Sequence, residues 1–176
     1  AYGDQMSGVL LLDTRQPQEP LHTEIGLSVY NTSLLNSGYS SGQAFDWLVS
    51  ARSSNLDVVL NDDLGKPDYA DVFAELGITL GEHHRLSINA LYADDQVVVI
   101  TESDPAELEQ SISDTQSTHA WLSFESQWTP ALASSTVLSY SALDNSRRAE
   151  ANDPERVTAR VSDLRDARIF GLRQDW

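Results

Sequence analysis

Histidine and carboxylate side chains, which can bind a metal ion or transfer a proton, come close together at two places in the sequence. Glu82 directly precedes His83 and His84, but adjacent residues on a strand or turn point apart, and no third ligand follows at the spacing of a tetrahedral metal site. His119 shares the strand parity of Glu125, yet the two would stand about 20 Å apart along one strand, at roughly 3.3 Å per residue. We therefore expect a polar turn at the histidine pair and predict no metal site, no cofactor and no enzyme active site.

Acidic side chains form the remaining clusters that could do chemistry. Carboxylates on loops can bind Ca²⁺, but a dedicated Ca²⁺ loop places them at alternate positions ahead of a glycine, an order that is missing here. A solvated polar surface is therefore the favoured interpretation. Pro105 follows an aspartate, which predicts a short helix over residues 104–109 with Asp104 as its N-cap. The clustered residues are Asp62, Asp63, Asp94, Asp95, Glu102, Asp104, Glu107 and Glu109.

Composition and charge exclude several classes of function. The 176 residues carry 27 Asp plus Glu against 11 Lys plus Arg, which gives a formal net charge of −16. Nucleic-acid binding needs clustered positive charge, so we expect no nucleic-acid partner. The chain has no Cys, which excludes disulfides, thiolate metal sites and a cysteine nucleophile. The sequence also lacks a P-loop, a nucleophile elbow and a dinucleotide-binding fingerprint.

Most of the chain alternates between apolar and polar residues with a period of two, the pattern of a β-strand with one apolar and one polar face. In residues 70–80, for example, Val72 and Leu76 fall on one side and Asp71 on the other. The longest apolar runs have four residues, against about 18 for a membrane helix, so only strands could cross a membrane. We predict an all-β antiparallel meander of about eight strands, at residues 20–30, 31–37, 43–56, 70–80, 86–93, 119–125, 137–142 and 157–176.

The expected connections between these strands come in two sizes that alternate along the chain. Outer-membrane β-barrels show this alternation, with short periplasmic turns on one rim and longer loops on the other. The alternation requires a strand at residues 31–37. If these residues belong to a loop, the long connections fall on the rim that should carry the short periplasmic turns. The short connections are expected at residues 37–42, 81–84 and 129–133, and the long ones at residues 57–67, 94–114 and 144–155.

Three tryptophans are expected near the rim with the short turns. Trp128 and Trp176 have the apolar parity of their strands next to that rim, and Trp47 joins them if residues 37–42 are a short turn. Indole rings prefer the interface between hydrocarbon and water, so this grouping is typical of an aromatic girdle. The alternative interpretation is three tryptophans in the core of an ordinary β-sandwich.

The first residues of the chain resemble a known family. Residues 2–15 are similar to the last plug segment of TonB-dependent outer-membrane receptors, where a tyrosine–glycine pair precedes two glycines, a β-branched run and a threonine. Ser7 replaces the first of the two glycines, and Leu10 and Leu12 stand where Ile and Val are commoner. Residues 47–71 resemble early barrel strands of these receptors. The matching plug residues are Tyr2, Gly3, Gly8, Val9 and Thr14.

This resemblance implies both a fold and a function. Residues 1–16 would be the C-terminal end of the plug domain and residues 17–176 the first part of a transmembrane β-barrel of about 22 strands. Because the chain opens on Ala1 without Met, we expect a processed product or a fragment. Its partners would be the rest of its own barrel and plug, the lipid of a Gram-negative outer membrane, and the TonB energy-transducing complex, contacted through a segment outside this chain. The function would be energised uptake of a scarce ligand, such as a siderophore, cobalamin, a glycan or a metal complex.

The resemblance also implies which residues face the ligand and the barrel lumen. The expected loop at residues 94–114 would face outward, which makes Asp94, Asp95, Glu102, Asp104 and Glu107 the candidate ligand contacts. The lumen would be lined by polar residues, with Arg52 in a structural ion pair. The expected lumen residues are Glu24, Asp46, Arg52, Asp71, Glu75 and Glu125.

A soluble, secreted all-β ligand-binding module, such as a lectin-like sandwich, is the alternative. A β-rich hydrolase is a third possibility, but it needs convergent acid and base residues that the sequence does not offer. The first two hypotheses differ in where the apolar face points. A sandwich buries that face between two sheets, whereas a barrel wall exposes it to lipid.

Overall fold

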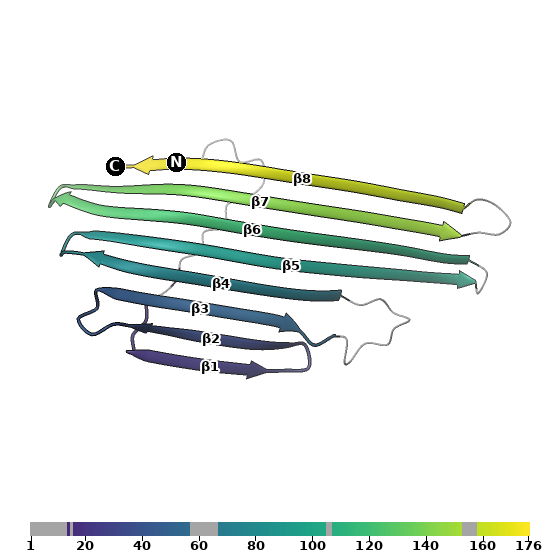
Figure 1. Cartoon of the computed structure of the whole chain (residues 1–176), viewed down its shortest axis with the longest axis horizontal. Coiled ribbons are helices and arrows are strands. Elements are labelled where there is room, and N and C mark those ends of the chain that lie inside the picture. Colours follow the sequence, from purple (N-terminus) through teal and green to yellow (C-terminus); the bar gives the residue numbers. More distant parts are fainter. Residues whose placement is uncertain (1–13, 15, 57–66, 105–106, 153–157) are drawn as a thin grey trace.

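The computed structural model describes residue 14 and residues 16–56, 67–104, 107–152 and 158–176. These residues form one sheet of eight antiparallel strands, and the strands follow one another in space in their chain order (Figure 1). The predicted all-β meander of eight strands is thereby confirmed, including the strand that begins at residue 31. The strands are β1 (Leu21–Leu27), β2 (Asn31–Tyr39), β3 (Phe45–Ser54), β4 (Pro67–Leu80), β5 (His84–Asp104), β6 (Glu107–Thr129), β7 (Leu132–Asn152) and β8 (Thr158–Asp175).

The strand register divides the side chains of the sheet between two faces. Successive side chains on a strand point to opposite sides, and residues paired across strands share a side. Leu76 pairs with Ile88, and Ile88 pairs with Leu122, so these three lie on one side, which we call the apolar face. Glu75 pairs with Asn89, and the side that carries them is called the polar face.

Burial on the two faces is the reverse of that in a water-soluble domain. Ile88, on the apolar face, is 44% exposed, whereas its neighbour Asn89, on the polar face, is only 5% exposed. Soluble proteins bury apolar residues first and leave most polar ones in water. Among the described residues, Ala142 is the sole buried apolar residue, while the buried polar residues are Ser37, Asp46, Asn89, Ser126 and Ser134. The sheet therefore has no apolar core of its own.

Three short turns lie at one end of the sheet, where the sequence predicts them. They join β2 to β3, β4 to β5 and β6 to β7, and Figure 1 shows all three on the same side. Gly42 and Gly81 have positive φ angles of 84° and 72° in the first two turns. Glycine adopts this left-handed conformation without the steric cost that a β-carbon adds, so the sequence supplies the residue that each turn needs.

The long connections expected at residues 94–114 and 144–155 are wrong. β5 continues to Asp104 and pairs with β6 as far as Glu107, while β7 continues to Asn152 and pairs there with Thr158 of β8. The short helix expected over residues 104–109 is wrong as well, because Asp104 and Glu107 are strand residues. The third long connection falls on residues 57–66, outside the described residues.

The reason for this error is that apolar and polar residues no longer alternate there, since three polar residues are followed by four apolar ones at residues 94–100. Asp94, Asp95 and Gln96 follow one another in β5, so the period-two signal disappears although the strand continues. Backbone pairing does not require an apolar side chain, since every buried N–H and C=O must find a partner whatever its side chain. β5 to β8 consequently extend farther than β1 to β4 on the side away from the short turns (Figure 1).

Nowhere in the described part of the chain is there a helix of the length and hydrophobicity needed to span a membrane.

The continuation of β5 predicts slow amide exchange at residues 94–97. These residues pair with β4 on one side and with β6 on the other, so their amides should exchange more than about tenfold slower than those of an open loop. Hydrogen exchange followed by mass spectrometry or NMR measures this, with the turn at residues 41–44 as the fast reference. Equal exchange rates in the two segments would contradict the strand assignment.

Candidate functional site

The apolar face carries a continuous band of exposed apolar side chains. We call it the apolar band; on β5 it runs through Leu86, Ile88, Ala90 and Tyr92. Neighbouring strands continue it, because each of these residues pairs with a residue of the same face on β4 and β6. Exposed members on the other strands include Ile25, Leu34, Val49, Val72, Leu76, Leu122, Leu138, Phe170 and Leu172.

The apolar band ends abruptly at one row of paired residues. One row beyond Tyr92, Asp94 pairs with Gln116, Gln116 with Asp144 of β7, and Asp144 with Asp166 of β8. Gln116 Nε2 donates a hydrogen bond to Asp94 Oδ2 at 3.4 Å. The face that is apolar near the short turns thus becomes acidic and hydrogen-bonding at this row of β5 to β8.

Aromatic rings gather at the short-turn end of the apolar face. The His84 ring lies 6.0 Å from the ring of Phe124 and 5.5 Å from that of Trp128. Trp128 Nε1 donates to Ser134 Oγ at 2.9 Å, so the indole has a polar partner at the sheet end and an exposed apolar ring. Trp47 lies on the same face, where it pairs with Gly38 and Leu76. The predicted placement of Trp47 and Trp128 near this end is confirmed, and Trp176 follows directly after β8.

An ion pair on the polar face joins β3 to β5 across β4. Arg85 donates from Nη1 and Nη2 to the two carboxylate oxygens of Asp46, each at 2.7 Å. Glu75 lies 3.9 Å from the same guanidinium. Gly77 stands between the partners: a β-carbon there would lie 2.2 Å from Arg85 Nη2 and 2.4 Å from Asp46 Oδ1. The absence of a side chain at residue 77 is what lets this bidentate pair form.

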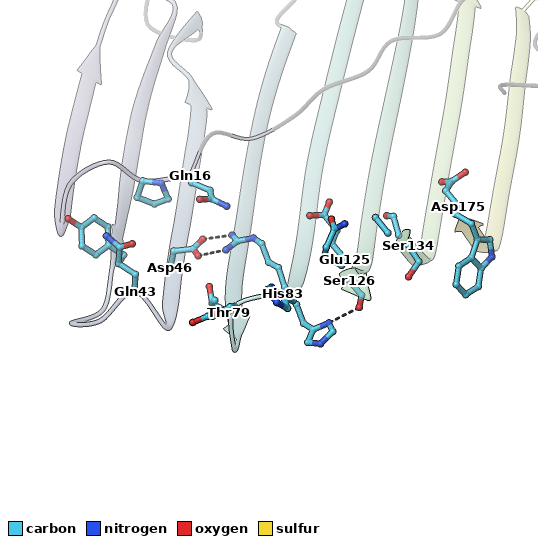
Figure 2. A pocket seen from close by; sticks show the side chains of 18 residues that line it. Gln16, Gln43, Asp46, Thr79, His83, Glu125, Ser126, Ser134 and Asp175 are labelled. Carbon is cyan, nitrogen blue, oxygen red and sulfur yellow. Dashed lines mark hydrogen bonds and ion pairs between the residues drawn. The ribbon is translucent and has the colours of Figure 1, made fainter. Parts of the chain in front are cut away.

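A hollow of about 690 Å³ surrounds this ion pair at the short-turn end of the sheet. Figure 2 shows Gln16, Asp46 and Glu125 among the side chains that line it. Thr14 Oγ1 donates to Glu75 Oε2 at 2.5 Å, so the chain just before β1 lies against the polar face. The other residues of the expected plug remnant at 1–16, apart from Gln16, fall outside the described residues, and the boundary after residue 16 stays a prediction.

A second ion pair and an aromatic pair lie farther along the polar face. Arg52 Nε donates to both Asp71 oxygens, at 3.1 and 3.0 Å, as predicted for a structural ion pair. The rings of Phe73 and Trp121 stack with their centroids 5.9 Å apart. Leu91 pairs with Phe73 across the strands and adds to this apolar surface. We call Phe73, Leu91 and Trp121 the aromatic patch.

The residues expected to line a lumen share the polar face, as predicted. Asp46 pairs with Gly77, Arg52 with Asp71, and Glu75 with Leu48. The register of β1, β2, β5 and β6 places Glu24 and Glu125 on the same side. Arg85 belongs to this set but was missed, because nothing local marks it as the partner of Asp46, 39 residues away. The only sequence signal was its polar parity directly after the turn that begins at Gly81.

The expected ligand contacts lie on strands and not on a loop. Asp94 is on the apolar face and Asp95 on the polar face, while Glu102, Asp104 and Glu107 lie where β5 and β6 end and begin. Asp94 and Asp95 therefore point to opposite sides of the sheet and cannot contact one ligand together. The ligand-contact role of all five stays a prediction.

His83 and His84 also separate, as adjacent residues should. His83 is in the turn, whereas His84 is the first residue of β5. His84 Nδ1 lies 2.6 Å from Ser126 Oγ of β6. The described residues contain no group of three His, Cys, Asp or Glu side chains that could hold a metal ion. The imidazole of His84 thus acts here as a ring contact and hydrogen-bond partner.

Comparison with protein families, curated proteins and solved structures finds no match for this chain. The resemblance to TonB-dependent receptors is therefore carried by the residues quoted above.

Replacing Gly77 by Ala should destabilise the sheet by about 1–3 kcal/mol, because the added methyl overlaps the Arg85–Asp46 pair. Urea unfolding followed by tryptophan fluorescence measures the free energy of unfolding. Gly171→Ala is the matched control: its β-carbon would meet only the rotatable hydroxyl of Ser139, so the change should stay below about 1 kcal/mol. In an Arg85→Ala background the Gly77→Ala penalty should shrink, and an unchanged penalty would contradict the assignment.

Proposed function

We propose that this chain forms part of the wall of a transmembrane β-barrel in a Gram-negative outer membrane. The observation that carries the proposal is the reversed burial of the sheet, with Ile88 exposed and Asn89 buried. Exposed apolar side chains are stable against hydrocarbon, while an alternating polar face suits a lumen. A single curved layer that is apolar outside and polar inside meets both requirements.

The height of the apolar band supports the same proposal. Together with His84 of the aromatic cluster, the apolar band extends over residues 84–92 of β5, and a membrane-spanning β-strand needs about 9–11 residues when it is tilted. The extended parts of β5 to β8 then stand in water, which explains why most of their side chains are polar on both faces. The aromatic cluster of His84, Phe124 and Trp128 lies at the other limit of the band, where amphipathic rings favour the headgroup region.

The resemblance at residues 2–15 and 47–71 makes a TonB-dependent receptor the proposed family. In this proposal residues 1–16 end the plug, residues 17–176 begin the barrel, and the remaining strands close it. The function is energised import of a scarce ligand, with the TonB complex as the energy source. Thr14 contacts the polar face through Glu75, which supports a plug-derived segment on the lumen side.

The soluble sandwich lacks a comparable observation. It requires a second layer over the apolar face, and the described residues form one sheet only. The exposed apolar side chains from β1 to β8 would then face water without a cover, which is costly at roughly 25 cal/mol per Å².

A charge on the apolar face should weaken membrane insertion, whereas a charge on the polar face should not. Leu122→Arg places a guanidinium inside the apolar band and should reduce insertion by about 2–4 kcal/mol. Ser123→Arg is the matched control, because Ser123 is the next residue, lies on the polar face and pairs with the small Ser87. The vesicle-bound folded fraction, measured by flotation after refolding from urea, gives the difference.

Two outcomes would contradict the proposed membrane location. One is equal insertion of the Leu122→Arg and Ser123→Arg variants. The other is a stable, folded monomer in water without detergent or lipid, because the apolar band would then need no hydrocarbon.

The transport function predicts an uptake defect. Cells that lack the protein should lose uptake of one ligand class among siderophores, cobalamin and glycans, and a protonophore should abolish the same uptake in unmodified cells. Uptake assays with radiolabelled ligands measure both effects. Unchanged uptake of every class would overturn the receptor proposal while leaving the barrel wall intact.

A further inference from the structure

Trp121 stands at the centre of a ring of polar side chains on the polar face. The strand register places Asn89 of β5 and Ser139 of β7 beside it. Along β6, His119 and Ser123 are the nearest residues that point to the same side of the sheet. The indole therefore has a polar neighbour in each of the four directions across and along the strands.

Most of these polar groups have no hydrogen-bond partner in the part of the chain that the structure describes. The exception is His119, whose Nδ1 lies 2.9 Å from Ser141 Oγ. Asn89 is the clearest case, because it is only 5% exposed and buried polar groups nearly always find a partner. The unpartnered groups are the amide of Asn89, the hydroxyls of Ser123 and Ser139, and the indole N–H of Trp121.

These unpartnered groups are open to a ligand. Among the described residues that are not exposed, Ser146 Oγ is the one polar side-chain atom that lacks both a partner and contact with solvent. The groups around Trp121 are therefore in contact with solvent, although their residues are buried or half-buried. A buried stem holds the polar end of a side chain in place, which reduces the ordering that binding requires.

The aromatic patch fixes the indole among these groups. The rings of Phe73 and Trp121 stack with their centroids 5.9 Å apart and an interplanar angle of 26°, and Leu91 pairs with Phe73. The face of an aromatic ring is electron-rich and attracts groups that carry a partial positive charge. The C–H groups on one face of a sugar ring have this character.

The charges near Trp121 favour a neutral ligand. Glu75 pairs with Asn89 and disfavours an anion, but it attracts a cation little, because it lies 3.9 Å from Arg85 and accepts a hydrogen bond from Thr14. A purely apolar ligand would cover the amide and hydroxyls without bonding them, which is unfavourable. A neutral ligand with an apolar face and hydroxyl edges meets all of these conditions.

We propose that the polar face binds a neutral saccharide at Trp121. The C–H face of one sugar ring packs on the indole, and its hydroxyl groups bond to Asn89, Ser123 and Ser139. Paired residues on neighbouring strands lie about 5 Å apart and alternate residues of one strand about 7 Å apart, so all three side chains are near a ring that lies on the indole. This assignment rests on the proposed function only in identifying the imported ligand as a glycan.

Titration calorimetry measures this binding on the intact protein in lauryldimethylamine oxide, a detergent without a sugar headgroup. The probes are neutral hexasaccharides of glucose, xylose, mannose and N-acetylglucosamine. Saturation-transfer NMR on the bound probe gives a second measurement, because the C–H protons that pack on the indole should receive the strongest saturation. At least one probe should bind.

Substitutions around the indole should weaken binding in a defined order. Trp121→Ala should raise the dissociation constant at least tenfold, and Trp121→Phe should raise it less, because a phenyl ring keeps part of the stacking surface. Asn89→Ala and Ser139→Ala should each raise it at least threefold. Ser117→Ala is the matched control: Ser117 lies on the same face of β6, four residues from Trp121, and the change should stay within twofold.

Three results would overturn the saccharide site. They are no binding of any probe, the same affinity in Trp121→Ala, Asn89→Ala and the unmodified protein, and equally strong binding of cyclohexylmethanol, an apolar ring of similar size. If Trp121→Ala does not fold, Asn89→Ala and Ser139→Ala decide the question, because both remove only a small polar group.

Ser123→Arg separates failure of this site from failure of the proposed function. The variant should insert into vesicles as the unmodified protein does, yet bind the saccharide at least tenfold more weakly, because the guanidinium fills the space beside the indole. Normal insertion of the unmodified protein without saccharide binding would overturn the site and leave the barrel wall. Saccharide binding together with equal insertion of Leu122→Arg and Ser123→Arg would leave the site and overturn the membrane location.

Discussion

The cross-strand hydrogen-bond ladder is the constraint on which the rest of the structure depends. A single sheet without an apolar core of its own has few other contacts to hold it, so pairing from β1 to β8 carries the architecture. The register of that ladder also sorts every side chain. A slip of one residue between two strands would move Ile88 to the polar face and Asn89 to the apolar face. Any function that needs two different faces therefore needs this register.

Several side chains act as markers of the register because they fit in only one alignment. The Arg85–Asp46 pair crosses β4 at Gly77, and a shift would bring a side chain into the space that the ion pair occupies. On the other face, a β-carbon at Gly38 would lie 2.7 Å from the Trp47 ring, so the indole also requires a glycine opposite it. An ion pair on the polar face and an indole on the apolar face thus align the first half of the sheet, next to the rim where the short turns lie.

The polar and apolar character of the sheet changes along the strands as well as between the faces. Near the short turns the faces differ, and the Leu86 to Tyr92 segment carries apolar side chains on one face only. Beyond Asp94 most side chains on both faces are polar, and ion pairs such as that from Arg168 to Asp144, at 2.8 Å, are found there. One continuous sheet therefore combines a zone suited to hydrocarbon with a zone suited to water. This division, more than any single residue, supports a role at a membrane boundary.

The sequence by itself determined which residues share a face, because the period of two is a property of neighbouring residues. The expected lumen set, the apolar positions of 70–80 and the short turns at Gly42 and Gly81 all follow from such local patterns. Only the tertiary structure decided where strands end and which distant residues meet. β5 passes Asp94 without a period-two signal because its partners supply the hydrogen bonds. Arg85 meets Asp46 because β4 pairs with both β3 and β5 and carries a glycine between the two side chains. These features depend on pairing between segments far apart in the chain, which no local pattern contains.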